Sequence, residues 1–259
     1  MILAAPTQRP ISSIVNRIGA WLPRGWGDLA RQLAIFAVFD LFYEITRTLA
    51  VGDRSVALRH ARDIVSAERS LGIFHELDVQ HFAATSPHFV QAVANWTYFN
   101  CQFTVTFAFV LWVYLRRNAQ WKTVRNLVFA ANVLGLIGYV LLPTAPPRMF
   151  QSLGFIDTLG SMNSLNHGSG FVQVAANQYA AMPSLHAADA LIVGVMLITV
   201  TRRKWLRLLW ALWPLWVWFC VMATANHFWL DVVGGIAVAL LALVLLQSHR
   251  FLRLFPRLA

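Results

Sequence analysis

The segment TANHFWLDVVGG, residues 224–235, places a histidine and an aspartate four residues apart at the start of a long apolar run. Positions i and i+4 share a face on a helix, so the side chains of His227 and Asp231 can meet. A carboxylate beside one imidazole nitrogen fixes the tautomer and leaves a lone pair on the other nitrogen. The spacing therefore predicts a nucleophile, His227, and a residue that orients it, Asp231.

Two further segments place polar residues beside apolar runs: LLPTAPPRMF contains Arg148, and AMPSLHAADA contains Ser184 and His186. An arginine presents a planar fork of donors that suits phosphate oxygens. Ser184 and Asn226 are residue types that begin helices, and helix N-termini favour anions, so we expect phosphate near both. His186 could protonate a leaving oxygen. The three segments together predict phosphoryl chemistry.

A metal site is the alternative for the first pair, because His227 and Asp231 are both possible ligands. The chain has no dense ligand motif such as H-E-x-x-H. Cys101 and Cys220 lie inside apolar runs, so we expect small core residues and no disulfide framework. Metal-free chemistry is therefore the favoured interpretation.

The elements that must carry these residues are apolar. Of the 259 residues, 58% are hydrophobic and 12% are charged, whereas a soluble domain has about 25% charged residues. Crossing a bilayer takes roughly 20 apolar residues, and such runs occupy 29–50, 89–115, 122–142, 184–201, 205–224 and 227–247. No linker separates them. We predict one domain over 1–259, all-α and polytopic, with a bundle of six transmembrane helices.

The net charge of +10 could indicate nucleic acid, but the basic residues form short clusters beside the apolar runs, as membrane topology requires. Fifteen of the 21 basic residues lie before the first run, between the second and third, between the fourth and fifth, after the last, or in the first turn of the run that follows one of these segments. The positive-inside rule then makes both termini cytoplasmic. The three polar segments fall on the extracytoplasmic face of the cell membrane.

The segment between the first two runs, residues 54–82, has apolar positions at helical spacing, which predicts an amphipathic helix lying on the outer surface. Those positions are Val56, Ala57, Ala61, Ile64, Val65 and Leu71. The loop after the third run is long and turn-rich, which is typical of a functional loop. The remaining histidines are expected to be surface residues: His60, His75, His81, His88, His167 and His249.

Within the first run, Asp40, Glu44 and Arg47 follow i, i+4, i+7 spacing and form one polar stripe. Ionisable residues at such depth are costly and usually face the bundle interior. We expect Arg47 to bind phosphate and Glu44 to position it or to contact an acceptor, with Tyr43 beside them in a supporting role. The alternatives are a Glu–Arg pair that only fixes packing, or a non-catalytic lipid-binding protein or transporter that uses the stripe as a pathway.

Asp189 lies one turn beyond His186. It could orient that histidine or have a purely structural role, and both interpretations stay open.

The motifs PTAPPR, MPSLH and TANHFWLD, in that order, resemble the type 2 phosphatidic acid phosphatase superfamily, particularly its inositolphosphotransferase branch, which includes inositol phosphorylceramide synthase. The resemblance implies that His227 attacks phosphorus, Asp231 orients it, His186 is the general acid and Arg148 binds phosphate. It implies a phosphohistidine intermediate, no metal or other cofactor, a membrane lipid as substrate, and water, a polyol or another alcohol as acceptor.

The chain departs from the phosphatase branch at three places. Cys220 and Val221 stand where that branch has a Ser-Arg pair, Leu185 replaces a glycine before the second-motif histidine, and no lysine precedes Arg148 in GYVLLPTAPPR. Two phosphate-binding cations are thus missing. We expect Arg47 to supply a replacement.

Overall fold

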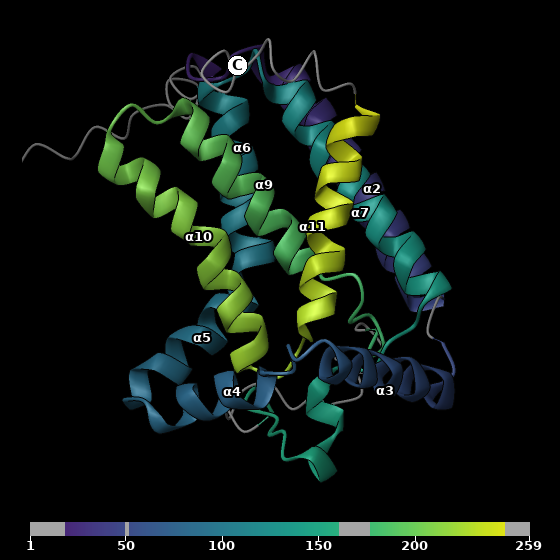
Figure 1. Cartoon of the computed structure of the whole chain (residues 1–259). Helices are drawn as coiled ribbons and strands as arrows, with labels where there is room; N and C mark the ends of the chain where they lie inside the picture. Colours follow the sequence, from purple (N-terminus) through teal and green to yellow (C-terminus); the bar gives the residue numbers. More distant parts are fainter. Residues whose placement is uncertain (1–18, 50–51, 161–176, 247–259) are drawn as a thin grey trace, which may run out of the picture.

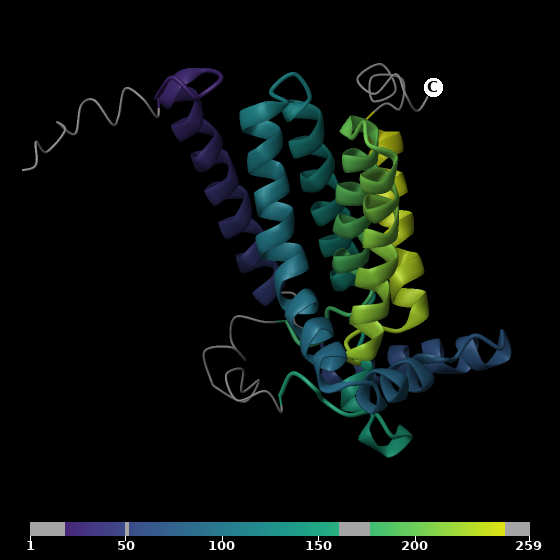
Figure 2. The ribbon, with the colours of Figure 1, turned by 90° about the vertical axis from the view of Figure 1, so that its left-hand side faces the viewer.

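The computed structural model describes residues 19–49, 52–160 and 177–246, and these residues are all-α. Long helices run side by side, while α3 (Arg54–Ser70) and α4 (Glu76–Thr85) lie across one end, which we call the site end (Figures 1 and 2). The long helices are α2 (Gly25–Leu49), α5 (His88–Asn100), α6 (Thr106–Arg116), α7 (Trp121–Leu141), α9 (Leu185–Val200), α10 (Lys204–Ala223) and α11 (Trp229–Leu245).

Each of the six apolar runs contains a helix, with one irregularity. In the second run α5 leads into α6 through a π-helical turn, Cys101–Val105, where the Thr106 hydroxyl donates to the Cys101 carbonyl at 2.9 Å. Among the described helices only α7 and α10 are both long and apolar enough to cross a membrane, each with a mean hydropathy of 1.6. Helices α6, α9 and α11 are apolar but shorter. The count of six spans therefore stays a prediction.

The segment between the first two runs forms two helices instead of the single amphipathic helix expected. Helix α3 begins at Asp53, whose carboxylate accepts the N–H groups of Ser55 and Val56. Its buried face contains four of the predicted apolar residues, Ala57, Ala61, Ile64 and Val65, and also Glu68. Leu71, expected on that face, is 64% exposed because α3 ends before it.

The predictions for both cysteines and for three of the six other histidines are confirmed. Cys101 and Cys220 are buried and free. His75, His81 and His88 are exposed, whereas His60 is half-buried, with Nδ1 2.8 Å from the Pro143 carbonyl. His167 and His249 lie outside the described residues.

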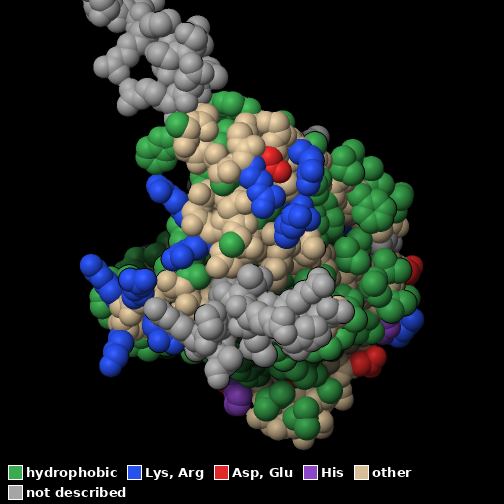
Figure 3. Space-filling view, turned by 90° about the horizontal axis from the view of Figure 1, so that it is seen from above, with side chains coloured by type: hydrophobic (Ala, Val, Ile, Leu, Met, Phe, Trp, Pro, Cys, Tyr) green, Lys and Arg blue, Asp and Glu red, His purple; other side chains and the backbone are tan. Residues whose placement is uncertain are grey.

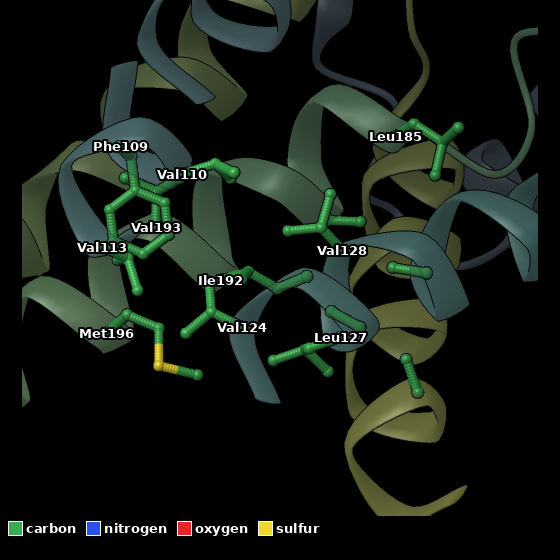
Figure 4. Packing of buried hydrophobic residues seen from close by; sticks show 14 of the residues in the cluster. Phe109, Val110, Val113, Val124, Leu127, Val128, Leu185, Ile192, Val193 and Met196 are labelled. Atoms are coloured by element: carbon green, nitrogen blue, oxygen red, sulfur yellow. The ribbon is translucent and has the colours of Figure 1, made fainter. Parts of the chain in front are cut away.

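Helix α9, which carries His186, packs against α7, α10 and α11. Its side chains interdigitate with those of α6 and α7 in the main hydrophobic cluster (Figure 4), whose labelled members are Phe109, Val110, Val113, Val124, Leu127, Val128, Leu185, Ile192, Val193 and Met196. Close packing of this kind leaves few voids and restricts how far a helix can shift. The cluster therefore fixes the start of α9 at the site end.

Lysine and arginine side chains gather at the end of the bundle opposite α3, as Figure 3 shows from above. The α6–α7 and α9–α10 connections lie at this end (Figure 1) and carry Arg116, Arg117, Lys122, Arg202, Arg203 and Lys204. The basic residues expected near the termini, Arg9, Arg17, Arg250, Arg253 and Arg257, lie outside the described residues. The described clusters are thus on the far side from the three polar segments.

Candidate active site

Main-chain hydrogen bonds join the three polar segments at the site end. The Arg148 N–H donates to the Ala225 carbonyl at 2.8 Å, and the Ser184 N–H donates to the Asp231 carbonyl at 2.9 Å. Ala225 adopts a left-handed φ of 53°, unusual for a residue with a side chain. The backbone itself therefore brings the predicted site residues into one region.

His227 is almost fully buried, and its orientation is set by a carbonyl group. Its Nδ1 lies 2.8 Å from the Ala181 carbonyl and 3.6 Å from Asp231 Oδ2. Because a carbonyl only accepts, Nδ1 carries the hydrogen and Nε2 keeps its lone pair. The predicted contact with Asp231 is thus longer than a hydrogen bond, and the carboxylate acts on the ring through its nearby charge.

His186 lies beside His227, with their ring centroids 5.6 Å apart. The His186 ring stacks on that of Tyr98 of α5, at 4.4 Å between centroids and 12° between planes. The Tyr98 main chain also lies near the His186 ring. The sequence did not identify Tyr98, because one tyrosine in an apolar run gives no signal.

Arg148 and Asn226 form a side-chain pair: Arg148 Nη1 donates to Asn226 Oδ1. The Asn226 amide nitrogen donates to the Thr224 carbonyl at 3.0 Å, so the amide is held from both sides. The prediction that Asn226 begins the last helix is wrong. Phe228 is the N-cap of α11, because the left-handed Ala225 turns the chain sharply and two further residues precede the helix.

Acidic side chains occupy the first N–H groups of α11. Asp231 Oδ2 accepts from Phe228 at 2.8 Å, and two glutamates that the sequence did not identify, Glu76 and Glu68, accept from the next two residues. The prediction that this N-terminus offers its N–H groups to a phosphate is therefore wrong. Its positive end is already neutralised by carboxylates.

Ser184 begins α9 as predicted, and its hydroxyl accepts the Ala187 N–H at 3.3 Å. The side chain is fully buried and does not line the cavity described below. A phosphate-binding role for Ser184 stays a prediction without support from its position.

On α2, Arg47 and Glu44 form an ion pair of 2.5 Å, and the Arg47 guanidinium lies 6.0 Å from the Tyr43 ring. Arg47, Arg148 and Tyr98 all line the cavity described below. The expectation that α2 faces the site is consistent with this position.

A cavity of about 1020 Å³ connects these side chains. Nine of the predicted site residues and their neighbours line it: Asp40, Tyr43, Glu44, Arg47, Arg148, His186, Asp189, Asn226 and His227. Further along α2, α6 and α7 its wall becomes apolar, with Phe36, Phe39, Phe107, Val110, Val128 and Phe129. Phe36 is eleven residues from Arg47 on α2, about 16 Å along the helix axis. The cavity therefore combines a charged region with an apolar one.

Asp189 also lines the cavity. It is 2% exposed, and the side chain of Asn132 on α7 lies nearby. Its Oδ1 atom has no hydrogen-bond partner among the described residues. An orienting role of Asp189 toward His186 stays a prediction.

Metal ligands do not cluster in this region. Across residues 19–49, 52–160 and 177–246, no three His, Cys, Asp or Glu side chains are arranged to hold a metal ion. What the site offers is an imidazole with an available lone pair, a second imidazole beside it, and two arginines.

Comparison with known proteins agrees with this inventory. The PAP2 superfamily model matches residues 62–245. The chain is 27% identical over 234 residues to the phosphoinositol dihydroceramide synthase of Bacteroides thetaiotaomicron, across 82% of this chain and 75% of the relative. No solved structure matched the chain. Since the family match covers well over half of its length, this membrane protein belongs to the PAP2 superfamily of lipid phosphatases and phosphotransferases.

Proposed function

We propose that the protein transfers a phosphorylated headgroup, of the inositol phosphate type, from a membrane phospholipid to a lipid alcohol. The observation that carries the proposal is the opening of His227, His186, Arg148 and Arg47 onto one cavity that also has an apolar region. The relative named above is called a phosphoinositol dihydroceramide synthase, which supports transfer over hydrolysis.

In the first step, His227 Nε2 attacks phosphorus and the bond from phosphorus to the lipid oxygen breaks. His186 donates a proton to that oxygen, and the lipid leaves as an alcohol. Arg148 and Arg47 stabilise the negative charge that develops on the phosphoryl oxygens. The Ala181 carbonyl and Asp231 stabilise the positive charge that the His227 ring gains.

In the second step, the acceptor alcohol attacks the phosphohistidine and gives its proton to His186, and the phosphorus–nitrogen bond breaks. The apolar part of the cavity would hold the acceptor tail, and Asp189 Oδ1 would accept a hydrogen bond from a donor group close to the reacting hydroxyl. The reaction takes place at the extracytoplasmic face, with both termini cytoplasmic.

Purified protein in detergent or vesicles, incubated with headgroup-labelled phosphatidylinositol and a ceramide, tests the proposal. We expect label in a new lipid, no reaction with His227→Ala, and normal reaction with the matched control His81→Ala, because His81 is exposed on α4. Release of water-soluble inositol phosphate alone would favour hydrolysis over transfer. Undiminished turnover by His227→Ala would overturn the mechanism.

A further inference from the structure

Two buried glutamates meet at the N-terminus of α11. Glu68 from α3 and Glu76 from α4 are 0% and 1% exposed. Glu68 Oε1 accepts the N–H of Leu230 at 2.7 Å, and Glu76 Oε1 accepts that of Trp229 at 2.8 Å. These are the first two residues of α11 and follow His227 by two and three positions. The glutamates thus hold the end of the helix beside the proposed nucleophile.

The two carboxyl groups also lie within hydrogen-bonding reach of each other. Their second oxygens, Glu68 Oε2 and Glu76 Oε2, have no N–H or O–H donor among the described residues. Two carboxylates so close in a buried site cannot both ionise readily. One proton held between them removes the repulsion and gives both free oxygens a partner.

The charges around the pair agree with a shared proton. Burial, and after it the charge on Glu76, raises the pKa of Glu68 to about 9, and Asp231 on α11 acts in the same direction. At neutral pH Glu68 then holds a proton, which removes the repulsion between the two carboxyl groups. A single negative charge is what the positive end of a helix stabilises.

We propose that Glu68 and Glu76 are positioning residues, a singly protonated carboxyl pair that fixes the N-terminus of α11 and thereby the placement of His227 and Asp231. The inference rests on the proposed function, since it takes His227 as the nucleophile. Loss of the proton at alkaline pH would put two negative charges in contact and displace one carboxyl from its backbone N–H. Nucleophile placement would then fail while substrate binding by Arg148 continued.

Glutamine and alanine variants separate positioning from folding. Glu68→Gln and Glu76→Gln each keep an acceptor for the α11 N–H and add a donor to the remaining carboxylate. We expect a kcat close to wild type at neutral pH, and a kcat that no longer falls at alkaline pH as it does in the wild type. Glu68→Ala and Glu76→Ala remove the acceptor, and we expect kcat to fall about 10- to 100-fold with little change in KM.

The matched control is Asp63→Asn, which removes a carboxylate on the exposed face of α3 and should leave kcat and its pH profile unchanged. All rates are taken per folded protein, after size-exclusion chromatography and near-ultraviolet circular dichroism. The proposal would be overturned if the folded alanine variants had the wild-type kcat. It would also be overturned if kcat of both glutamine variants fell at alkaline pH as it does in the wild type. A failure of the proposed function would appear differently, as turnover by His227→Ala.

Discussion

The guanidinium of Arg148 donates a hydrogen bond to the side chain of Asn226, the residue directly before His227. Arg148, the cation of the first motif, is therefore oriented by Asn226 of the third motif. Asn226 is 2% exposed and is itself held by Thr224. Phosphate binding and nucleophile placement thus depend on one short loop.

Asn226→Ala should release Arg148 and leave the guanidinium without its side-chain acceptor. We expect a higher KM for the lipid phosphoester and a lower kcat/KM, together with a loss of about 1 to 3 kcal/mol in the free energy of unfolding from the broken amide contacts. Steady-state kinetics and thermal unfolding measure the two effects. Asn100→Ala, an asparagine at the end of α5 that donates only to its own helix, is the control. Unchanged KM would show that Arg148 does not need this support.

Arg47 has two competing roles, phosphate binding or packing through its pair with Glu44. The double variant Arg47→Met/Glu44→Met distinguishes them, because an apolar pair of similar size can replace an ion pair that serves only packing. We expect folded protein with kcat/KM reduced about 100-fold, the usual effect of removing a donor that stabilises transition-state charge.

Arg31→Ala, an exposed residue of the same helix, is the control for the Arg47 experiment. Arg47→Lys should recover part of the activity, since it keeps the charge but loses the planar fork. Normal activity of the double Met variant would assign Arg47 to packing alone.

The sequence was informative where residue type and spacing carry the signal. The helix positions, the buried face of α3 and the meeting of three distant motifs all follow from apolar periodicity and chain order. His227, His186, Arg148 and Arg47, which the sequence analysis assigned to one site, all line the cavity.

Contacts made by the backbone or by residues distant in sequence could not be predicted. The Ala181 carbonyl that orients His227 belongs to no motif, and Ala225 gives no sign of its left-handed conformation. Glu68 and Glu76 could not be identified from the sequence, because their partners are N–H groups 162 and 153 residues later. These carboxyl groups meet the first N–H groups of α11 only in the folded protein, where α3 and α4 lie at the start of that helix.

Gly235 allows α11 to approach the start of α9. A Cβ atom at this position would lie 2.1 Å from the Ser184 carbonyl oxygen, a backbone atom that cannot swing aside. Gly235→Ala should separate the two helices, move His227 away from His186 and cost about 1 to 3 kcal/mol of stability through overpacking.

Thermal unfolding and kcat together measure the effect of Gly235→Ala. The control is Gly27→Ala on α2, where an added Cβ meets nothing within 4 Å. If Gly235→Ala retained wild-type kcat, a tight α9–α11 contact would not be needed for catalysis.

Protonation of Glu68 also predicts how stability varies with pH. Its pKa is raised from 4.5 to about 9 by burial and by Glu76. A raised folded-state pKa gives a stabilisation that is complete below pH 4.5 and is lost as the pH rises through 9, because the folded protein holds a proton that the unfolded chain releases.

The unfolding temperature of the wild type should therefore fall across this window, and Glu68→Gln should have a flatter profile. Thermal unfolding in a pH series, with Asp63→Asn as the matched control, provides the measurement. Parallel profiles for the wild type and Glu68→Gln would show that no such proton is bound.

In the proposed mechanism, we expect Asp189 to influence which acceptor attacks the phosphohistidine. The Oδ1 atom of its carboxylate has no partner among the described residues and accepts hydrogen bonds. It therefore favours an alcohol such as a ceramide, which carries a hydroxyl or amide N–H next to the reacting oxygen. A diacylglycerol is less favoured, because its ester groups donate no hydrogen bond.

Asp189→Asn keeps the shape but puts an amide in place of the carboxylate. We expect release of water-soluble headgroup to rise relative to transfer, while cleavage of the donor lipid continues. The ratio of the two products measures this partition, and Asp78→Asn on the exposed face of α4 is the control. If the acceptor donates a hydrogen bond to this oxygen, replacing the carboxylate changes that bond and so changes the ratio. An unchanged ratio would therefore place the acceptor elsewhere in the cavity.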